Sequence, residues 1–413
     1  MTTIDIERVK HDILELGQIG RDPESRGIYR MAFTPADMEG KRWLQSRIDQ
    51  AGLQSSMDGA GNVSGLLPDP INGQHPRLVI GSHIDTVPCA GMLDGALGVI
   101  VGLECLRRLK EMGHRSPIPI ELVSFSDEEG RFGNMFGSEA FTGKLTLERL
   151  QTATDLDSQK LWDCLLEVGL NPMAALDACR NPADLWGYLE LHIEQGPVLD
   201  KQGVPLGVVE DITGLFKWGV TLQGVANHAG TTPMDLRHDA FMGLAEFAHE
   251  ISRILDENGS RQSRATIGRA QILPGSANTV PGRVDFSLDV RDTSSRVLDE
   301  LAMAFRKALS AIARRRGLTF DYEQQSWIQP VACASRLNEQ LIRSIEELGI
   351  DYLKMPSGAA HDAQMVASIA PIAMLFVPSR EGLSHSPAEW TNWNHVQDAA
   401  NVMLKFLLNL SFC

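Results

Sequence analysis

The chain has 413 residues, 43% of them hydrophobic and 22% charged, as in soluble globular proteins, and its length predicts two or three domains. A formal net charge of −15 with no basic stripe argues against a nucleic-acid or anionic-membrane partner. No stretch reaches the ~18 apolar residues of a transmembrane helix, and residues 1–17 lack the apolar core of a signal peptide. We therefore expect a cytoplasmic protein with no membrane partner.

The first 211 residues show an α/β pattern. The predicted elements are helices at 3–17 and 35–51, short strands within 53–66, a strand at 76–84, a helix at 95–112, a strand at 119–126, short helices within 145–180 and a strand at 186–196. Thr34 and Pro35 suit the N-cap and first position of the second helix. The strand–helix–strand unit at 76–126 predicts parallel strands that end at one crevice.

From residue 212 the order becomes strand, helix, two strands, helix and strand, which is typical of a ferredoxin-like α+β unit. The predicted elements are a strand at 215–225, helix Asp239–Glu257, strands Ala265–Leu273 and Arg283–Val290, helix Ser295–Arg316 and strand Leu318–Tyr322. We expect this second domain, 212–327, to be inserted into the α/β domain formed by 1–211 and 328–413. The α/β pattern resumes with a helix at 336–348, a Gly/Ala turn at 355–364, a strand at 371–379 and a helix at 392–408.

The six cysteines lie apart from one another and form no CxxC pair, at positions 89, 105, 164, 179, 333 and 413. Their spacing suits a reducing compartment and argues against a disulfide framework or a thiolate metal site. A metal ion in this chain would therefore need histidine and carboxylate ligands.

Residues 81–95, GSHIDTVPCAGMLDG, connect a buried strand to a helix, where open α/β sheets keep their sites. His83 and Asp85 point to the same side of an extended backbone, and Asp94 can fold back after a glycine-containing loop. Such a group can hold a metal ion, with a second carboxylate such as Asp85 orienting the imidazole from behind. The alternative is an ordinary helix start, with Asp94 as N-cap and His83 as a core residue.

Asp127, Glu128 and Glu129 directly follow a buried strand. Adjacent carboxylates repel one another unless a cation or protons neutralise them. Because neighbouring residues on an extended segment point in opposite directions, one glutamate could bind a metal ion while the other acts as a general base on water. The alternative is a solvated loop.

His192 ends the strand at 186–196, and His385 lies in a loop beyond the strand at 371–379, with Glu389 near enough to support it. Each histidine alone is more often a core or surface residue than a ligand. The joint pattern is stronger. His83, His192, His385 and one of the two glutamates offer two metal ions about two terminal ligands each, with Asp94 able to bridge.

These segments resemble a known family. The motifs GSHIDTV, MLDG, DEEGRFG, ELHIEQGPVL, VANHAGTTPM, GSANTVPG, DVRD, SGAAHDAQ and LSHSPAEW are similar, in this order, to the hydantoinase/carbamoylase-type amidases of the M20 metallopeptidase clan. That group includes N-carbamoyl-L-amino-acid hydrolases, allantoate amidohydrolases and β-ureidopropionases. Peptidases of the clan usually have an acidic residue where this chain has His192, so the histidine favours the ureido-cleaving branch.

The resemblance implies roles for single residues. His83 and His192 would bind one metal ion, Glu129 and His385 the other, and Asp94 would bridge them. Glu128 would be the general base, and Asp85 would support the ligands. The ions would be two divalent metals per subunit, with Zn expected first and Mn, Co or Ni also accepted by nitrogen and oxygen ligands.

The inserted domain would serve as a dimerisation and lid domain in a homodimer. His228 and Asn278 would reach the active site of the partner subunit, and Arg291 would bind the substrate carboxylate. Without the resemblance, His228 would be a turn residue and Arg291 part of a surface ion pair with Asp289 or Asp292. The substrate would also contact Gln195 and the loop of Ser357, Gly358 and Ala359, and, with less weight, His361.

The expected reaction is metal-dependent hydrolysis of the ureido C–N bond of a small carboxylate, first of all an N-carbamoyl-L-amino acid, with release of ammonia, carbon dioxide and the free amine. Allantoate amidohydrolase and β-ureidopropionase are the nearest alternatives. An M20-type peptidase or N-deacylase is a further one, and a catalytically silent dimeric binding protein is another class. The complete set of ligands and base argues against the last.

Overall fold

The structure, a computed structural model, describes residues 3–67, 76–133 and 135–411. The chain divides into two compact units, Met1–Glu210 with Cys333–Cys413, and Asp211–Ala332. The predicted insertion, 212–327, lies within the second unit, and its role as a dimerisation and lid domain stays a prediction. No helix in the described ranges has the length and apolar character needed to cross a bilayer. The described cysteines are free thiols, and Cys413 lies outside the described residues.

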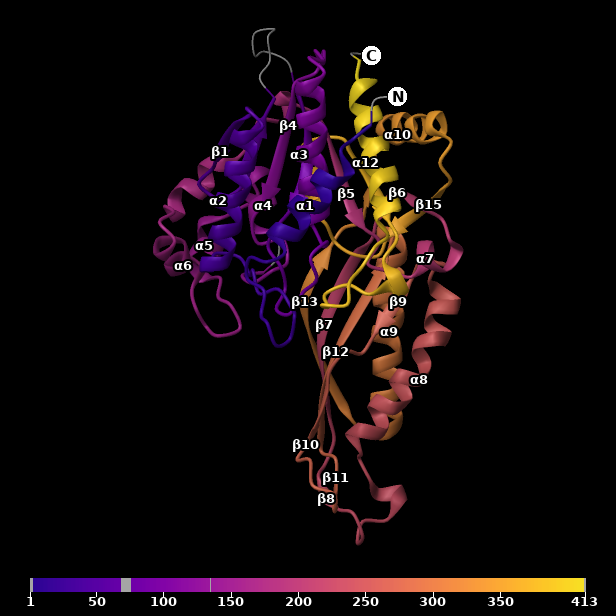
Figure 1. The fold of residues 1–413 in the computed structure, drawn as a ribbon. Helices are drawn as coiled ribbons and strands as arrows, with labels where there is room; N and C mark the ends of the chain where they lie inside the picture. The colour runs from indigo at the N-terminus through magenta and orange to yellow at the C-terminus, as the bar shows by residue number, and fades with distance from the viewer. Residues whose placement is uncertain (1–2, 68–75, 134, 412–413) are drawn as a thin grey trace. The chain divides into compact units, whose positions relative to one another are not determined.

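The first unit carries most of a mixed sheet flanked by helices (Figure 1). Up to Ile212, the elements are α1 (Ile6–Leu16), α2 (Pro35–Gln50), β1 (Gln54–Met57), β2 (Val63–Leu66), β3 (Arg77–His83), α3 (Ala96–Glu111), β4 (Ile120–Phe125), α4 (Phe136–Phe141), α5 (Leu147–Thr152), α6 (Leu161–Glu167), the 3-10 turns η1 (Pro172–Ala178) and η2 (Pro182–Asp184), β5 (Leu185–Ile193), α7 (Val198–Gln202) and β6 (Leu206–Ile212). After the second unit come α10 (Ser335–Leu348), β15 (Tyr352–Ser357), α11 (Asp362–Val366), β16 (Ile372–Val377), η4 (Arg380–Gly382) and α12 (Trp393–Leu408).

The nine-stranded sheet has the order β1-β2-β4-β3-β5-β16-β6-β14, with β14 at Val331–Ala332 and β15 paired to β6. Its central strands β4, β3, β5 and β16 are parallel neighbours, so their carboxyl ends lie at one edge. The register places His83 beside Phe125 and His192 beside Phe376. The segments that follow these strands therefore start from the same edge of the sheet.

Helix packing holds these strand ends in place. The apolar residues of α1, α3, α10 and α12 form one core with the strands, and residues of α4, α5, α6 and η1 form another. Helix α2 begins as predicted, with Pro35 in its first turn and the Thr34 hydroxyl accepting from the backbone N–H of Asp37. Helix α3 runs directly from the turn that carries Asp94, so its packing against β3 and β5 fixes that turn.

The second unit contains a five-stranded antiparallel sheet of order β10-β12-β7-β13, with β9 paired to β12 (Figure 1). Its elements are β7 (Gly214–Gln223), β8 (Asn227–His228), η3 (Met234–Leu236), α8 (Ala240–Asn258), β9 (Arg264–Thr266), β10 (Ala270–Leu273), β11 (Thr279–Val280), β12 (Arg283–Asp292), α9 (Ser295–Arg316) and β13 (Thr319–Ile328). Both helices share one apolar core with the sheet. The main strands and the two helices follow the predicted order, but the short strands β8 and β11 and the turn η3 were not predicted.

Several predicted boundaries were wrong. The strand expected at Ala265–Leu273 is interrupted between β9 and β10, where the Ser287 hydroxyl accepts from the N–H of Arg269. The last strand of the unit continues beyond Tyr322 to Ile328, through a bulge. The turn expected at 355–364 holds the end of β15 and the start of α11, and β6 and α4 lie where no element was predicted. Such short elements depend on packing rather than on their own periodicity.

Gly98 gives a test of how α3 is held. A Cβ there would lie 2.2 Å from the carbonyl oxygen of Leu191 in β5, which has no room to move. At Gly102, one turn later, a Cβ would lie 2.8 Å from a flexible Leu122 methyl group. We expect Gly98→Ala to destabilise the protein by about 2 kcal/mol and lower its unfolding midpoint by about 3 °C.

Gly102→Ala is the matched control, because the gain in helix propensity of up to ~1 kcal/mol should offset the contact. Its midpoint should stay within about 1 °C of the wild type by that balance. Thermal unfolding of the two variants checks the expectation, and equal shifts for both would contradict it.

Candidate metal-binding site

His83 ends β3 with its ring buried. Its Nδ1 lies 3.1 Å from the backbone oxygen of Asp85 and 3.8 Å from the nearer carboxylate oxygen of that residue. The Asp85 carboxylate instead accepts from the backbone N–H groups of Glu128 and Glu129, at 3.4 and 3.2 Å. Asp85 thus orients His83 through its backbone and the glutamates through its side chain.

Asp94 lies in the turn before α3, with its side chain buried. Its Oδ1 is 3.1 Å from His192 Nε2 and 3.8 Å from His83 Nε2, and its Oδ2 is 3.4 Å from His385 Nε2. Burial alone would raise the pKa of Asp94, but its hydrogen bonds with His192 and His385 hold that pKa well below the usual value. Among the described residues, Asp94 is the one carboxylate that all three rings approach.

Gly95, not Asp94, is the N-cap of α3, so the alternative role of Asp94 as a cap was wrong. Gly95 has φ 62°, and a Cβ there would lie 2.4 Å from the His83 ring. Both the left-handed backbone and the close approach of the imidazole require glycine.

The three acids after β4 are held in different ways. Asp127, at φ 55°, accepts from the backbone N–H groups of Arg131 and Phe132, so it shapes the loop. Glu128 Oε2 lies 3.5 Å from His83 Nε2, and Glu129 Oε2 lies 3.4 Å from His385 Nε2. The two glutamates therefore approach different histidines. Asp127 and Glu128 are buried, which excludes a simple solvated loop.

Packing these acids together changes their proton affinity. Burial raises the pKa of Asp127 to about 8 and that of Asp85 to about 7. Burial and nearby carboxylates raise the pKa of Glu128 and Glu129 well above the usual range. Burial lowers the pKa of His83 to about 4, which keeps its ring neutral as a ligand must be. A bound cation would relieve the repulsion between the carboxylates.

His192 and His385 complete the cluster. The His192 Nδ1 lies 2.9 Å from the backbone oxygen of Ile193, which leaves Nε2 for Asp94. Burial disfavours the charged ring of His192, yet its hydrogen bond with Asp94 raises its pKa to about 9. His385 is half exposed and has φ 54°, a left-handed conformation that non-glycine residues rarely adopt.

These side chains form two groups that could hold a metal ion, and Asp94 belongs to both: His83, Asp94 and His192, and Asp94, Glu129 and His385. The buried Oε1 atoms of Glu129 and Gln195 have no hydrogen-bond partner among the described residues. Imidazole and carboxylate donors with unused oxygens fit a divalent metal ion. Two further groups have ligand atoms close enough together to hold a metal ion. One consists of Glu190, His192 and His361, and the other of His11, Asp12 and Glu15 on α1.

Gln195, which has φ 58°, contacts the cluster around Asp94. Its Nε2 donates to Asp94 Oδ2 at 2.8 Å, and Ser384 Oγ donates to the same oxygen at 2.7 Å. The contact of Ser384 was not predicted, although its place next to His385 could have suggested it. Glu389, expected to support His385, accepts instead from the backbone of Leu93 and Asp94.

Ser357, the last residue of β15, and the loop that follows it were predicted to contact the substrate. The Ser357 hydroxyl is buried, 2.8 Å from His361 Nε2, and it also contacts the backbone N–H and carbonyl oxygen of Ala359. His361 is buried next to His192, with ring centroids 4.6 Å apart. Gly358 is exposed. The hydroxyl of Ser357 is thus engaged within the loop.

The remaining predicted residues lie in the second unit. His228 on β8 is exposed and pairs with Thr279, next to Asn278, in the short β8–β11 ladder. His228 Nδ1 accepts from the N–H of Gly230 at 3.1 Å. The proton of a neutral ring then sits on Nε2, which makes that atom a donor.

Arg291 lies near the far end of β12, so the length of this strand separates it from His228 and Asn278. Its Nε donates to Asp289 Oδ1 at 2.9 Å, which is the ion pair considered as an alternative to a substrate contact. Within this unit the structure therefore brings His228 and Asn278 together and leaves Arg291 apart.

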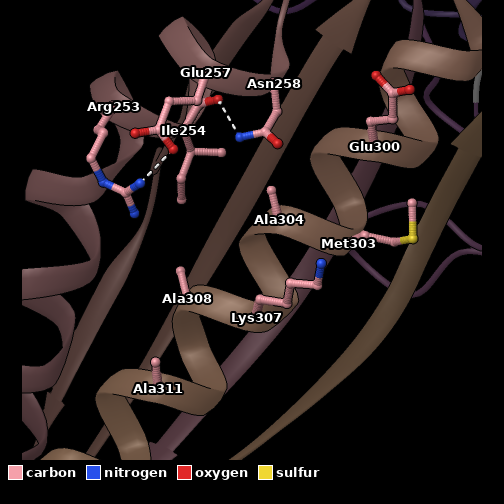
Figure 2. A pocket seen from close by; sticks show the side chains of 10 residues that line it. All are labelled: Arg253, Ile254, Glu257, Asn258, Glu300, Met303, Ala304, Lys307, Ala308 and Ala311. Carbon is pink, nitrogen blue, oxygen red and sulfur yellow. Dashed lines mark hydrogen bonds and ion pairs between the residues drawn. The ribbon is translucent and has the colours of Figure 1, made fainter.

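A hollow of about 400 Å³ lies between α8 and α9 (Figure 2). Apolar side chains such as Ile254 and Met303 line it, together with charged ones such as Arg253, which pairs with Glu257 at 2.6 Å. It contains none of the predicted site residues, so the chemistry lies elsewhere.

Known proteins are similar to this chain over nearly its whole length. An N-carbamoyl-L-amino acid amidohydrolase of Geobacillus stearothermophilus is 37% identical over 400 residues, 96% of each chain. An allantoate amidohydrolase of Bacillus subtilis is 34% identical, again over 96% of both chains. The crystal structure of an amidase of the hydantoinase/carbamoylase family from Burkholderia multivorans superposes with a TM-score of 0.91 at 33% identity, covering 98% of each chain.

The family model described as peptidase family M20/M25/M40 matches residues 79–409, which include every predicted ligand. The hydrolases of this family are metal-dependent, in agreement with the histidine and carboxylate groups around Asp94. By this match and by the similarity of its full-length relatives, the chain belongs to peptidase family M20/M25/M40.

Proposed function

We propose that the protein is an amidohydrolase that cleaves the ureido C–N bond of an N-carbamoyl-L-amino acid and releases ammonia, carbon dioxide and the free amine. The observation that carries this proposal is the pair of histidine–carboxylate groups that share Asp94, with Glu128 beside them. The names of the relatives support the bond type. Allantoate amidohydrolase and β-ureidopropionase remain the nearest alternatives, ahead of a peptidase or N-deacylase.

We propose two divalent ions per subunit, one held by His83 and His192, the other by Glu129 and His385, with Asp94 between them. Nitrogen and oxygen donors of this kind accept Zn, Mn, Co or Ni. When bound, such ions polarise a carbonyl group and make water more acidic. Asp85 would keep the glutamate backbone and His83 in place through the contacts described above.

Glu128 is proposed as the general base. A ureido carbon is a poor electrophile because two nitrogen atoms donate electrons to it, so the reaction needs an activated water. The raised pKa of Glu128, caused by burial and nearby carboxylates, suits a group that takes a proton from water and returns it to the departing nitrogen.

His228 is proposed to stabilise the developing oxyanion through its Nε2–H, with Asn278 beside it. We propose that both act in the active site of the partner subunit of a homodimer. Large apolar side chains around the β8 segment are exposed, which suits contact with a second copy: Val225, Met234, Leu236, Phe241 and Met242.

Arg291 is proposed to bind the substrate carboxylate by two parallel hydrogen bonds. Arg291 now pairs with the carboxylate of Asp289, and the carboxylate of a bound substrate would take the place of that acceptor. Gln195 and the loop of Ser357, Gly358 and Ala359 are proposed to hold the rest of the substrate, with backbone groups favoured because the Ser357 hydroxyl is engaged. We also propose a cytoplasmic location.

The experiment that tests the function is ammonia release by metal-reconstituted protein. The substrates are a panel of N-carbamoyl-L-amino acids, allantoate and N-carbamoyl-β-alanine, with a dipeptide and an N-acetylamino acid as controls. We expect turnover of N-carbamoyl-L-amino acids above the other two. Cleavage of a control with silence on all ureido compounds would assign the protein to the peptidase or deacylase branch.

Glu128→Gln should keep the fold and the bound metal but lower kcat by about 10²–10⁴-fold, because the amide cannot take a proton. Glu129→Gln is the comparison, since it should lower the metal content instead. Metal analysis and steady-state kinetics measure both effects. Normal turnover by Glu128→Gln would show that another group is the base.

Arg291→Lys should raise KM for substrates with an α-carboxylate by about 10–100-fold, since lysine cannot form two parallel hydrogen bonds. Neutral ureas should be affected far less. Arg283→Lys is a matched control, because Arg283 lies on the same strand and pairs with Asp285 at 2.9 Å in the same way. Equal effects of Arg291→Lys on both substrate classes would refute the proposed contact.

A further inference from the structure

Glu389 joins two loops that the sheet does not join. Asp94 lies in the loop after β3 and His385 in the loop after β16, and β5 lies between these two strands. No ladder of hydrogen bonds connects the loops directly, because β3 and β16 are not neighbours. The distance between Asp94 and His385 therefore depends on contacts between the loops themselves.

Glu389 provides such contacts from a buried position four residues after His385. Its Oε1 accepts from the backbone N–H of Leu93 at 2.8 Å and from that of Asp94 at 3.1 Å. Its own N–H donates to the Ser386 carbonyl oxygen at 3.0 Å, in a turn directly beside His385. The side chain of Glu389 thus holds the backbone of residues 93 and 94, and its own backbone belongs to the turn beside His385.

Ser384 completes the contact. Its hydroxyl lies 2.7 Å from Asp94 Oδ2 and 3.4 Å from Glu389 Oε2. The fit is close, since a Cβ at Gly91 would lie 2.5 Å from the Glu389 Cβ and carboxylate. The single proton of the Ser384 hydroxyl goes to Asp94 at the shorter distance, so the close contacts of the Glu389 carboxylate are the two backbone N–H groups at Oε1.

We infer that Glu389 is a positioning residue that sets the separation of Asp94 and His385 through its Oε1 atom, which accepts from two backbone N–H groups of the Asp94 loop. Its negative charge is not what the contact needs, because both of its main donors are neutral backbone N–H groups. The inference rests on the proposed metal centre, in which Asp94 and His385 serve the same ion. Supporting groups of this kind typically change metal affinity by about 10–100-fold.

Two variants separate geometry from charge. Glu389→Gln keeps the length and the oxygen acceptor, whereas Glu389→Asp keeps the charge but is one methylene too short to reach both N–H groups. Glu381→Gln, an exposed acid of the same loop, is the control. The measurements are calorimetric titration of the metal-free protein with Zn²⁺ and Mn²⁺, and hydrogen exchange of the 91–97 peptide without metal.

We expect Glu389→Asp to weaken one of two bound ions by about 10–100-fold and to speed exchange in the 91–97 peptide. Glu389→Gln should bind both ions within about threefold of the wild type, with exchange unchanged, as should Glu381→Gln. Loss of affinity in Glu389→Gln, with or without loss in Glu389→Asp, would overturn the inference in favour of a role for the charge. Wild-type affinity and exchange in both variants would also overturn it.

The same measurements distinguish a failure of the proposed metal centre from a failure of the positioning role of Glu389. Wild-type protein that binds no divalent ion would contradict the metal centre itself, while the exchange comparison would still report on the contact of Glu389 with residues 93 and 94. Two ions bound by the wild type, with no difference between Glu389→Asp and Glu389→Gln, would contradict the positioning role alone.

Discussion

The structure depends on a cluster of buried carboxylates at the ends of β3 and β4. Like charges repel, and burial removes the solvent that would screen them, so ionising them all is costly. The strands cannot separate to relieve this cost, because their registers are fixed by the sheet and by α3. The acids of this cluster are Asp85, Asp94, Asp127, Glu128 and Glu129.

Two buried cations, Lys41 and Arg30, lie near this cluster and offset part of its charge. Lys41 Nζ lies 2.9 Å from both Asp37 and the Ser126 hydroxyl, just before the acidic run. The Arg30 guanidinium donates to the backbone oxygen of Ile84, beside His83, at 2.7 Å. Burial lowers the pKa of Arg30 to about 10, which still leaves it charged at neutral pH. Among the described residues, neither cation forms an ion pair with a carboxylate that approaches a histidine, so those carboxylates can still attract a metal ion.

The sequence predicts that polar side chains gather at one edge of the sheet, because parallel strands end there. His83 and His192 lie at such strand ends, whereas Asp94 comes from the turn before α3, and their roles as ligands were implied by the family resemblance. The contact of Glu389 with Asp94 does not follow from the sequence, since it joins two loops whose paths depend on packing throughout the unit. Nor does the engagement of Ser357 with His361, because alternation in a short strand cannot show which hydroxyl turns inward.

Asp127, Gln195 and His385 share a left-handed backbone, with φ of 55°, 58° and 54°. This conformation costs most side chains on the order of 1 kcal/mol and is tolerated best by glycine and asparagine. In random mutagenesis of these three positions, a substitution must therefore suit the backbone conformation as well as the chemistry of the site. β-Branched residues at these positions should be depleted even where their polarity suits a new substrate, so a library for altered specificity gains more from varying the neighbouring residues.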